Sequence, residues 1–212
     1  MDDTFVRELE IDHVDKTTTL RFRQKLEGDV NCVVWDGAIV LAKYLERQCL
    51  KNSGFLENRS VIELGSGVGC VGIVAACLGA NVLLTDLPQA LPLLRQNVEE
   101  NKSKLKGCVE IEALDWGSPC KINCTPDVIL LAECIYYKEV VGSLVSTLRQ
   151  LATEKTNIIL CQELRDSQKQ RECWKEFLEN VKESFEVSFI PQTEQSLVYS
   201  SPEILILRLT KK

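Results

Sequence analysis

The sequence feature that most constrains this chain is a short apolar segment followed by a glycine-rich turn and a run with helical spacing. The segment 61–64 leads into Gly65-Ser66-Gly67-Val68-Gly69, where glycine occupies every second position, and residues 70–78 are mostly apolar. In strand-turn-helix units of this kind, backbone N–H groups at the helix start face a ligand, and the missing side chains allow close approach. The turn is therefore predicted to bind a nucleotide.

Two nucleotide templates fit this turn. Residues 67–72 match the GxGxxG pattern of dinucleotide sites, whereas the register that begins at Glu63 reads acid-x-Gly-x-Gly-x-Gly. A carboxylate at the strand end would repel the pyrophosphate of a dinucleotide, but it would attract a cationic amino-acid group. Glu63 therefore favours the second register. Asp86, at the end of the next predicted strand, can accept hydrogen bonds from ribose hydroxyls in either template, so it indicates a nucleoside without choosing between them.

Strand and helix patterns alternate along the rest of the chain. Residues 128–131 and 158–161 are apolar at every position, which is typical of central strands in a parallel sheet covered on both faces. The last two predicted strands, 186–190 and 204–209, are joined by a polar loop without a helical pattern, which favours an antiparallel pair. The pattern as a whole predicts an α/β fold.

The expected domain organisation is a single domain over residues 1–212. Residues 1–50 contain a predicted β-hairpin and a lead-in helix, and residues 51–212 contain the core with its sheet and covering helices. A chain of 212 residues is long enough to bury one full core.

Composition argues against several classes of partner. The formal net charge is −6, which gives no general basic surface for nucleic acid or an anionic membrane. No segment approaches the roughly 20 apolar residues of a membrane span, and the acidic start at residues 1–3 does not resemble a signal peptide. The ten cysteines are expected to stay reduced, and His13, the single histidine, argues against a zinc site. We therefore expect a cytoplasmic monomer, with the nucleus as a second location.

Family resemblance narrows the choice of nucleotide. The acidic glycine turn with Asp86 resembles the S-adenosyl-L-methionine site of class I, seven-stranded methyltransferases. Residues 33–38 (VVWDGA), 114–117 (LDWG) and 132–137 (AECIYY) resemble motifs of the methyltransferase-like 21 family of protein-lysine methyltransferases. The resemblance implies a mostly parallel, Rossmann-like sheet with an antiparallel last strand, S-adenosylmethionine as cofactor, and a protein lysine as acceptor. Within the family, the likeness is closest to the member that modifies the AAA ATPase valosin-containing protein.

The same resemblance implies a set of cofactor contacts. Without this resemblance, Trp35 and Trp116 would be interpreted as aromatic residues of the core. Glu63 is added by the charge argument above, and Asp115 is added as a candidate partner for the adenine amino group. The contacts implied by position are Trp35, Gly65, Ser66, Gly67, Asp86, Trp116 and Ala132.

Glu133 and Tyr136 are the predicted catalytic residues. They follow a central strand, at the edge of the sheet where open α/β folds place their ligands. A lysine ammonium, with an ordinary pKa of about 10.4, must lose a proton before its nitrogen can attack a methyl group. Glu133 can bind and orient this amine, while Tyr136 or Tyr137 offers an aromatic wall. Either Glu133 or water could accept the proton.

Three other functions stay open on the sequence. The acceptor could be another protein side chain or a small-molecule amine. The chain could instead be a binding module that keeps the cofactor pocket but has lost catalysis. The GxGxxG register would make it an NAD-dependent oxidoreductase.

Overall fold

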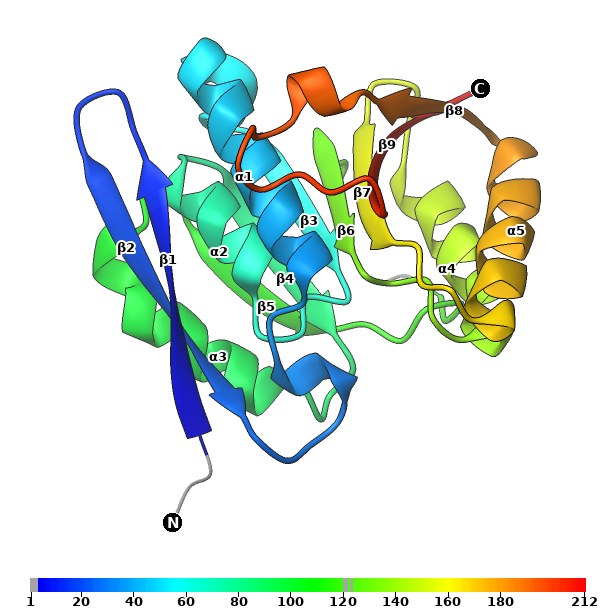
Figure 1. Ribbon diagram of the computed structural model, residues 1–212, viewed down its shortest axis with the longest axis horizontal. Coiled ribbons are helices and arrows are strands. Elements are labelled where there is room, and N and C mark those ends of the chain that lie inside the picture. Colours follow the sequence, from blue (N-terminus) through cyan, green and yellow to red (C-terminus); the bar gives the residue numbers. More distant parts are fainter. Residues whose placement is uncertain (1–3, 120–121, 123) are drawn as a thin grey trace.

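The computed structural model describes residues 4–119, 122 and 124–212, which are built around one seven-stranded sheet (Figure 1). The acidic start, residues 1–3, lies outside this part of the chain. The strand order is β5-β4-β3-β6-β7-β9-β8. Strands β3 to β7 run parallel, and β9 is antiparallel to both of its neighbours. The strands are β3 (Ser60–Leu64), β4 (Asn81–Asp86), β5 (Val109–Ala113), β6 (Val128–Ala132), β7 (Asn157–Glu163), β8 (Phe185–Ile190) and β9 (Ile204–Lys211).

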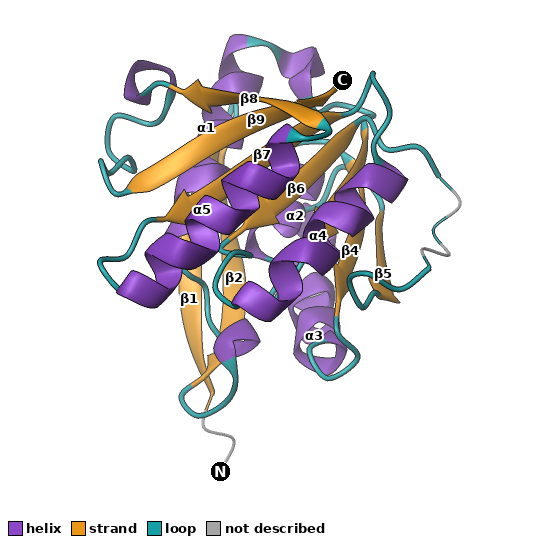
Figure 2. Cartoon of the chain, turned by 90° about the vertical axis from the view of Figure 1, so that its right-hand side faces the viewer, coloured by secondary structure: helices purple, strands orange, loops and turns teal. Residues whose placement is uncertain are grey.

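Helices cover both faces of the sheet, which confirms the predicted fold class. Helices α4 and α5 lie across the face that is turned to the viewer in Figure 2, and α1 and α2 pack on the opposite face. None of the helices in the described ranges is long and apolar enough to cross a membrane. The helices are α1 (Asp36–Lys51), α2 (Cys70–Cys77), α3 (Leu91–Asn101), α4 (Lys138–Leu151) and α5 (Gln168–Lys182), with short 3-10 turns η1 (Val30–Cys32), η2 (Ser53–Phe55), η3 (Lys102–Lys104) and η4 (Gln192–Glu194).

Side chains of the central strands point alternately to the two faces of the sheet, and each face has its own apolar core. In β3, Val61 packs into the core beneath α1 and α2, whereas Ile62 packs into the core beneath α4 and α5. Successive side chains of a strand point to opposite faces, so a strand buried on both sides must be apolar at nearly every position. This explains the continuous apolar runs of β6 and β7.

The glycine turn adopts a backbone that side chains would strain. Gly65, Gly67 and Gly69 have φ values of 66°, 52° and 87°, in the left-handed region that glycine enters without a steric penalty. A Cβ atom on Gly65 would also lie 3.0 Å from the Trp116 ring and from the Cys134 sulfur. The alternating glycines are therefore needed both for the turn and for the close approach of its neighbours.

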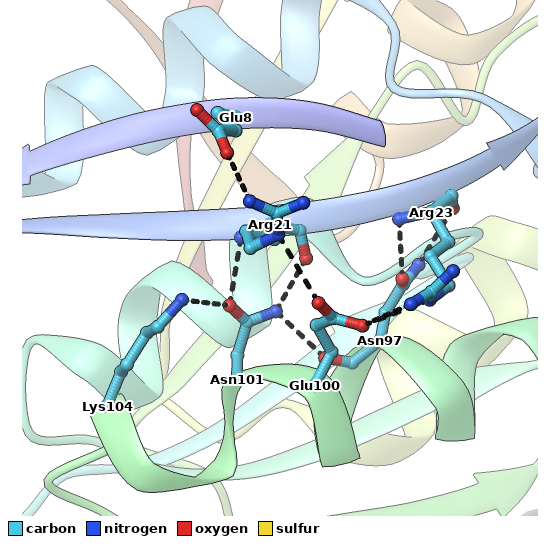
Figure 3. Close-up of polar contacts among 7 residues, drawn as sticks. All are labelled: Glu8, Arg21, Arg23, Asn97, Glu100, Asn101 and Lys104. Atoms are coloured by element: carbon cyan, nitrogen blue, oxygen red, sulfur yellow. Dashed lines mark hydrogen bonds and ion pairs between the residues drawn. The ribbon is translucent and has the colours of Figure 1, made fainter. Parts of the chain in front are cut away.

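The predicted N-terminal hairpin, β1 (Thr4–Asp12) and β2 (Thr17–Lys25), lies outside the main sheet and packs on α3 (Figure 1). Two fully buried amides of α3 pair with the backbone of β2 as a neighbouring strand would (Figure 3). Asn97 accepts from the Arg23 N–H at 2.7 Å and donates to the Arg23 carbonyl at 3.1 Å. Asn101 makes the equivalent bonds to Arg21, at 2.9 and 2.7 Å. Asn97 also donates to the Val68 carbonyl at 2.9 Å, so it joins the hairpin to the glycine turn.

The hairpin also holds the segment 29–35 that follows it. The Gln24 side chain, 2% exposed, accepts a hydrogen bond from the Val34 N–H at 2.7 Å, and the Arg7 guanidinium donates to the Val34 carbonyl at 3.1 Å. The backbone of Val34, in the segment between the hairpin and α1, is thereby held at both its N–H and its carbonyl.

Candidate active site

A cavity of about 330 Å³ lies at the carboxyl ends of β3, β4 and β6, between the glycine turn and the segment that follows the hairpin. The structure places every residue that the sequence analysis assigned to the site on the wall of this cavity. These residues are Trp35, Glu63, Gly65, Ser66, Gly67, Asp86, Asp115, Trp116, Ala132, Glu133 and Tyr136.

Glu63 lies at the base of the cavity and is 2% exposed. Its Oε2 atom accepts a hydrogen bond from the Gly72 N–H of α2 at 3.0 Å, which joins the strand to the helix on either side of the turn. Burial raises the pKa of this carboxyl to about 8, and the Gly72 N–H opposes the shift. A cationic group bound in the cavity would favour the ionised form.

Asp86 both shapes the turn and faces the cavity. Its two carboxylate oxygens accept hydrogen bonds from the Gly67 and Leu87 N–H groups, each at 2.7 Å. Burial raises the pKa of Asp86, while these two bonds lower it. An ionised carboxylate has about four acceptor positions, so two remain for the hydroxyls of a ribose.

The two tryptophans of the predicted site form walls of the cavity. The Trp35 indole N–H donates to the Val30 carbonyl at 2.8 Å, and the Arg165 guanidinium lies 4.6 Å from the Trp35 ring centroid. The Trp116 ring lies beside Gly65. The cavity therefore combines flat aromatic surfaces with acidic groups, as the binding of an adenosine with a cationic substituent requires.

Glu133 has an unusual backbone conformation immediately after β6. Its φ of 57° is in the left-handed region, which costs a non-glycine residue roughly 1–3 kcal/mol and is found preferentially at functional sites. Its carboxylate accepts a hydrogen bond from the Glu163 N–H at 2.9 Å and another from the Gln162 amide at 3.1 Å. The side chain is therefore directed toward the end of β7 and held there at both oxygens.

Gly37 provides the space that this carboxylate occupies. A Cβ atom at position 37, in the first turn of α1, would lie 1.9 Å from Glu133 Oε1. The sequence analysis did not assign Gly37 to the site. The sequence did contain a signal, since Gly37 lies inside a run with helical spacing. Glycine is unfavourable within a helix, so its presence there can indicate close packing.

Burial of the Glu133 carboxyl brings its pKa close to neutral pH. Burial raises its pKa to about 7, helped by the carboxylates of Glu163 and Asp36, while the Glu163 N–H and the Arg165 guanidinium oppose the shift. Both protonation states are therefore accessible at physiological pH.

Tyr136 completes the polar end of the cavity. Burial raises the pKa of its phenol to about 12, so the hydroxyl stays protonated at neutral pH. Its ring lies 4.6 Å from that of Tyr137, whose own ring faces the Lys169 ammonium at 5.1 Å. An acidic group and an aromatic wall are together suited to bind an amine cation.

Comparison with known proteins identifies the family. A family model described as lysine methyltransferase matches residues 14–184, which include the glycine turn, Asp86 and Glu133. The chain belongs to this lysine methyltransferase family. The family predicted from the sequence is thus confirmed, whereas particular closeness to the member that modifies valosin-containing protein is not tested.

Two curated relatives and one solved structure illustrate the likeness. Protein N-lysine methyltransferase METTL21A of Xenopus tropicalis is 44% identical over 138 residues, 64% of this chain and 62% of that protein. EEF1A lysine methyltransferase 3 of the same species is 36% identical over 151 residues, 70% of this chain and 65% of that protein. The matched part is therefore less than two thirds of either relative. The 16S rRNA N2 G1207 methyltransferase of T. thermophilus shares the fold, with a TM-score of 0.65 at 15% identity over 98% of this chain and 51% of that one.

Membership of the family confirms S-adenosylmethionine as the cofactor. The residues of the cavity are also chemically suited to S-adenosylmethionine. Gly65 and Gly67, which line the cavity, have no Cβ atoms to obstruct a ligand, and Asp86 keeps free acceptor positions beside them. Glu63 is a buried acid, and the cationic amino-acid end of a bound cofactor would compensate for the hydration that its carboxylate loses on burial.

The buried carboxyls should make the protein less stable as pH rises. The pKa values of Glu63 and Glu133 are raised to about 8 and about 7 from an ordinary value of 4.5. The folded state therefore binds more protons than the unfolded state between about pH 4.5 and 8, and the free energy of unfolding falls across this window. Denaturant unfolding from pH 5 to 8 measures the slope. Glu63→Gln should flatten it, and an equal slope in wild type and variant would contradict this interpretation.

Asn97 should matter to cofactor binding although it does not line the cavity. Replacing either Asn97 or Asn101 by leucine leaves β2 backbone groups without partners and should lower the free energy of unfolding by roughly 1–3 kcal/mol. Only Asn97 also bonds to the glycine turn, through the Val68 carbonyl. We expect Asn97→Leu to weaken S-adenosylmethionine binding about tenfold in calorimetry, a change of about 1.4 kcal/mol. Asn101→Leu is the matched control, and equal affinities of the two variants would show that the turn does not depend on this bond.

Proposed function

We propose that this chain is an S-adenosylmethionine-dependent protein-lysine N-methyltransferase. The observation that carries the proposal is the position of Glu133 and Tyr136 on the same cavity as the glycine turn and Asp86. Family membership and the names of the relatives support the same activity. An NAD-dependent oxidoreductase is disfavoured, because the acid at the end of β3 is buried at the start of the helix, where a pyrophosphate would lie.

The residues of this chain can prepare a lysine for methyl transfer. The bound cofactor supplies an electrophilic methyl group on a sulfonium sulfur. Ionised Glu133 would accept a hydrogen bond from the lysine nitrogen and so orient its lone pair for attack. Tyr136 holds the end of the side chain, and removal from water favours the neutral amine. The amine would release its proton to Glu133 or to water as it accepts the methyl group that the bound cofactor would supply.

The acceptor in this proposal is a lysine of a folded protein. The AAA ATPase valosin-containing protein is the first candidate, because the family motifs at residues 33–38, 114–117 and 132–137 lie in a sequence whose likeness within the family is closest to the member that modifies this ATPase. EEF1A, after which one of the relatives is named, is the second. We further propose that the enzyme works as a monomer in the cytoplasm, or also in the nucleus.

A labelled-cofactor assay tests the proposal directly. Cell lysate is incubated with the protein and S-adenosylmethionine that carries a radioactive methyl group, and the labelled residues are mapped by mass spectrometry. Purified valosin-containing protein and EEF1A are assayed in parallel. Label on one or a few lysines, absent with Glu133→Gln, is the expected result. Label on a metabolite or another side chain, or no label with a protein that binds the cofactor, would overturn the proposed activity.

A further inference from the structure

Gln162, the next-to-last residue of β7, connects three parts of the acceptor end of the cavity. Its side chain is 3% exposed. The amide nitrogen donates to Glu133 Oε2 at 3.1 Å and to the Glu163 carbonyl at 3.3 Å. The amide oxygen accepts from the Ile135 N–H at 3.0 Å. Both ends of the amide are therefore satisfied, and its orientation is fixed.

These contacts act on both residues of the predicted catalytic pair. The bond to Glu133 and the neighbouring bond from the Glu163 N–H hold the two carboxylate oxygens from the same strand end. The bond to Ile135 holds the loop between Glu133 and Tyr136. A glutamate side chain has three rotatable bonds and would otherwise sample several directions, so a fixed direction requires such partners.

We propose that Gln162 is the positioning residue of the acceptor site, which fixes the direction of the Glu133 carboxylate and the loop that carries Tyr136. This inference rests on the proposed function, because it concerns how the acceptor amine is held. Gln162 does not line the main cavity, so its action passes through Glu133.

The amide should also influence the protonation of Glu133. The charged groups that act on Glu133 are Asp36 from α1, together with Glu163 and Arg165 from the end of β7 and the loop after it. The buried thiols of Cys134 and Cys161 also interact with it. An N–H donor favours the ionised form of a carboxyl. Loss of the Gln162 donor should therefore raise the pKa of Glu133 above about 7.

The test is a carboxyl titration in Gln162→Leu. The protein is labelled with carbon-13 at the glutamate carboxyl carbon, and the Glu133 signal is assigned by its disappearance in Glu133→Gln. We expect the titration midpoint of Glu133 to move up by about one pH unit in Gln162→Leu. Gln162→Glu keeps the shape of the side chain, removes the amide donor and adds a second carboxyl, so its midpoint should move further. Gln195→Leu is the matched control, because Gln195 is also buried, at 2% exposure, but bonds to the Ile190 carbonyl.

Methyl transfer provides a second and separate readout. The rising limb of kcat/KM against pH should move by the same amount in Gln162→Leu, with activity recovering at high pH and the affinity for S-adenosylmethionine unchanged. An unmoved titration in folded Gln162→Leu and Gln162→Glu would overturn the inference, as would an equal shift in Gln195→Leu. A moved titration in a protein that methylates no lysine would overturn the proposed function, while supporting the control of Glu133 by Gln162.

Discussion

Replacement of Glu133 by glutamine is expected to lower kcat/KM for methyl transfer by roughly 100-fold to 10,000-fold, the range associated with loss of a positioned acid or base. Glutamine keeps the shape of the side chain but cannot carry the charge that orients an amine. The protein should still bind S-adenosylmethionine, because the glycine turn and Asp86 are unchanged. Initial rates with labelled cofactor and calorimetry with unlabelled cofactor measure the two effects separately.

Two further variants test whether the loss of activity depends on the charge and the position of Glu133. Glu133→Asp keeps the charge but shortens the reach to the Gln162 and Glu163 donors, so its activity should lie between those of wild type and Glu133→Gln. Glu110→Gln makes the same chemical change at an exposed position of β5 and should leave the rate unchanged. Full activity of Glu133→Gln would remove Glu133 from the catalytic site.

Replacement of Gly37 by alanine should reduce kcat/KM about 100-fold, because a 1 Å misplacement of a catalytic group can cost this much. The added Cβ would lie 1.9 Å from Glu133 Oε1 and 2.8 Å from its Cδ, so the carboxylate must leave its two donors. The cofactor affinity should change less than twofold. Steady-state kinetics and calorimetry on the same preparation distinguish a displaced carboxylate from a lost cofactor site.

Gly142→Ala is the matched control for this variant. Gly142 also lies in a helix, but a Cβ there meets no atom within 4 Å. Alanine should therefore keep activity and stabilise the protein by up to about 1 kcal/mol, the difference in helix propensity. Normal kinetics in Gly37→Ala would show that the Glu133 carboxylate can act from another position.

The sequence was sufficient for the fold class because the relevant information is local. A buried parallel strand must be apolar on both faces, a left-handed turn needs glycine, and the antiparallel strands β8 and β9 need no helix between them. The residues at the predicted strand ends, such as Glu63 and Asp86, could also be placed near one ligand, since parallel strands bring their carboxyl ends to one edge. The predicted site residues at or after strand ends line one cavity for this reason, whereas Trp35 reaches it from the segment that follows the hairpin.

Some features of the site could not be read from local patterns. The sequence does not show that Gly37, in the first turn of α1, touches Glu133, or that Gln162 bonds to its carboxylate. Nor does it show that Asn97 of α3 joins the hairpin to the glycine turn. Each contact links elements far apart in the chain.

What the sequence by itself determined is therefore the α/β fold and a nucleotide-binding glycine turn with acids at the ends of its strands, while the resemblance to a family supplied the methyl donor. The tertiary structure decided how those residues are held: the left-handed backbone of Glu133, the space at Gly37 and the donors at the end of β7. The physical reason is that periodicity and turn chemistry are set by neighbours in the chain. The direction of a side chain in a cavity depends on which distant elements the sheet order brings together.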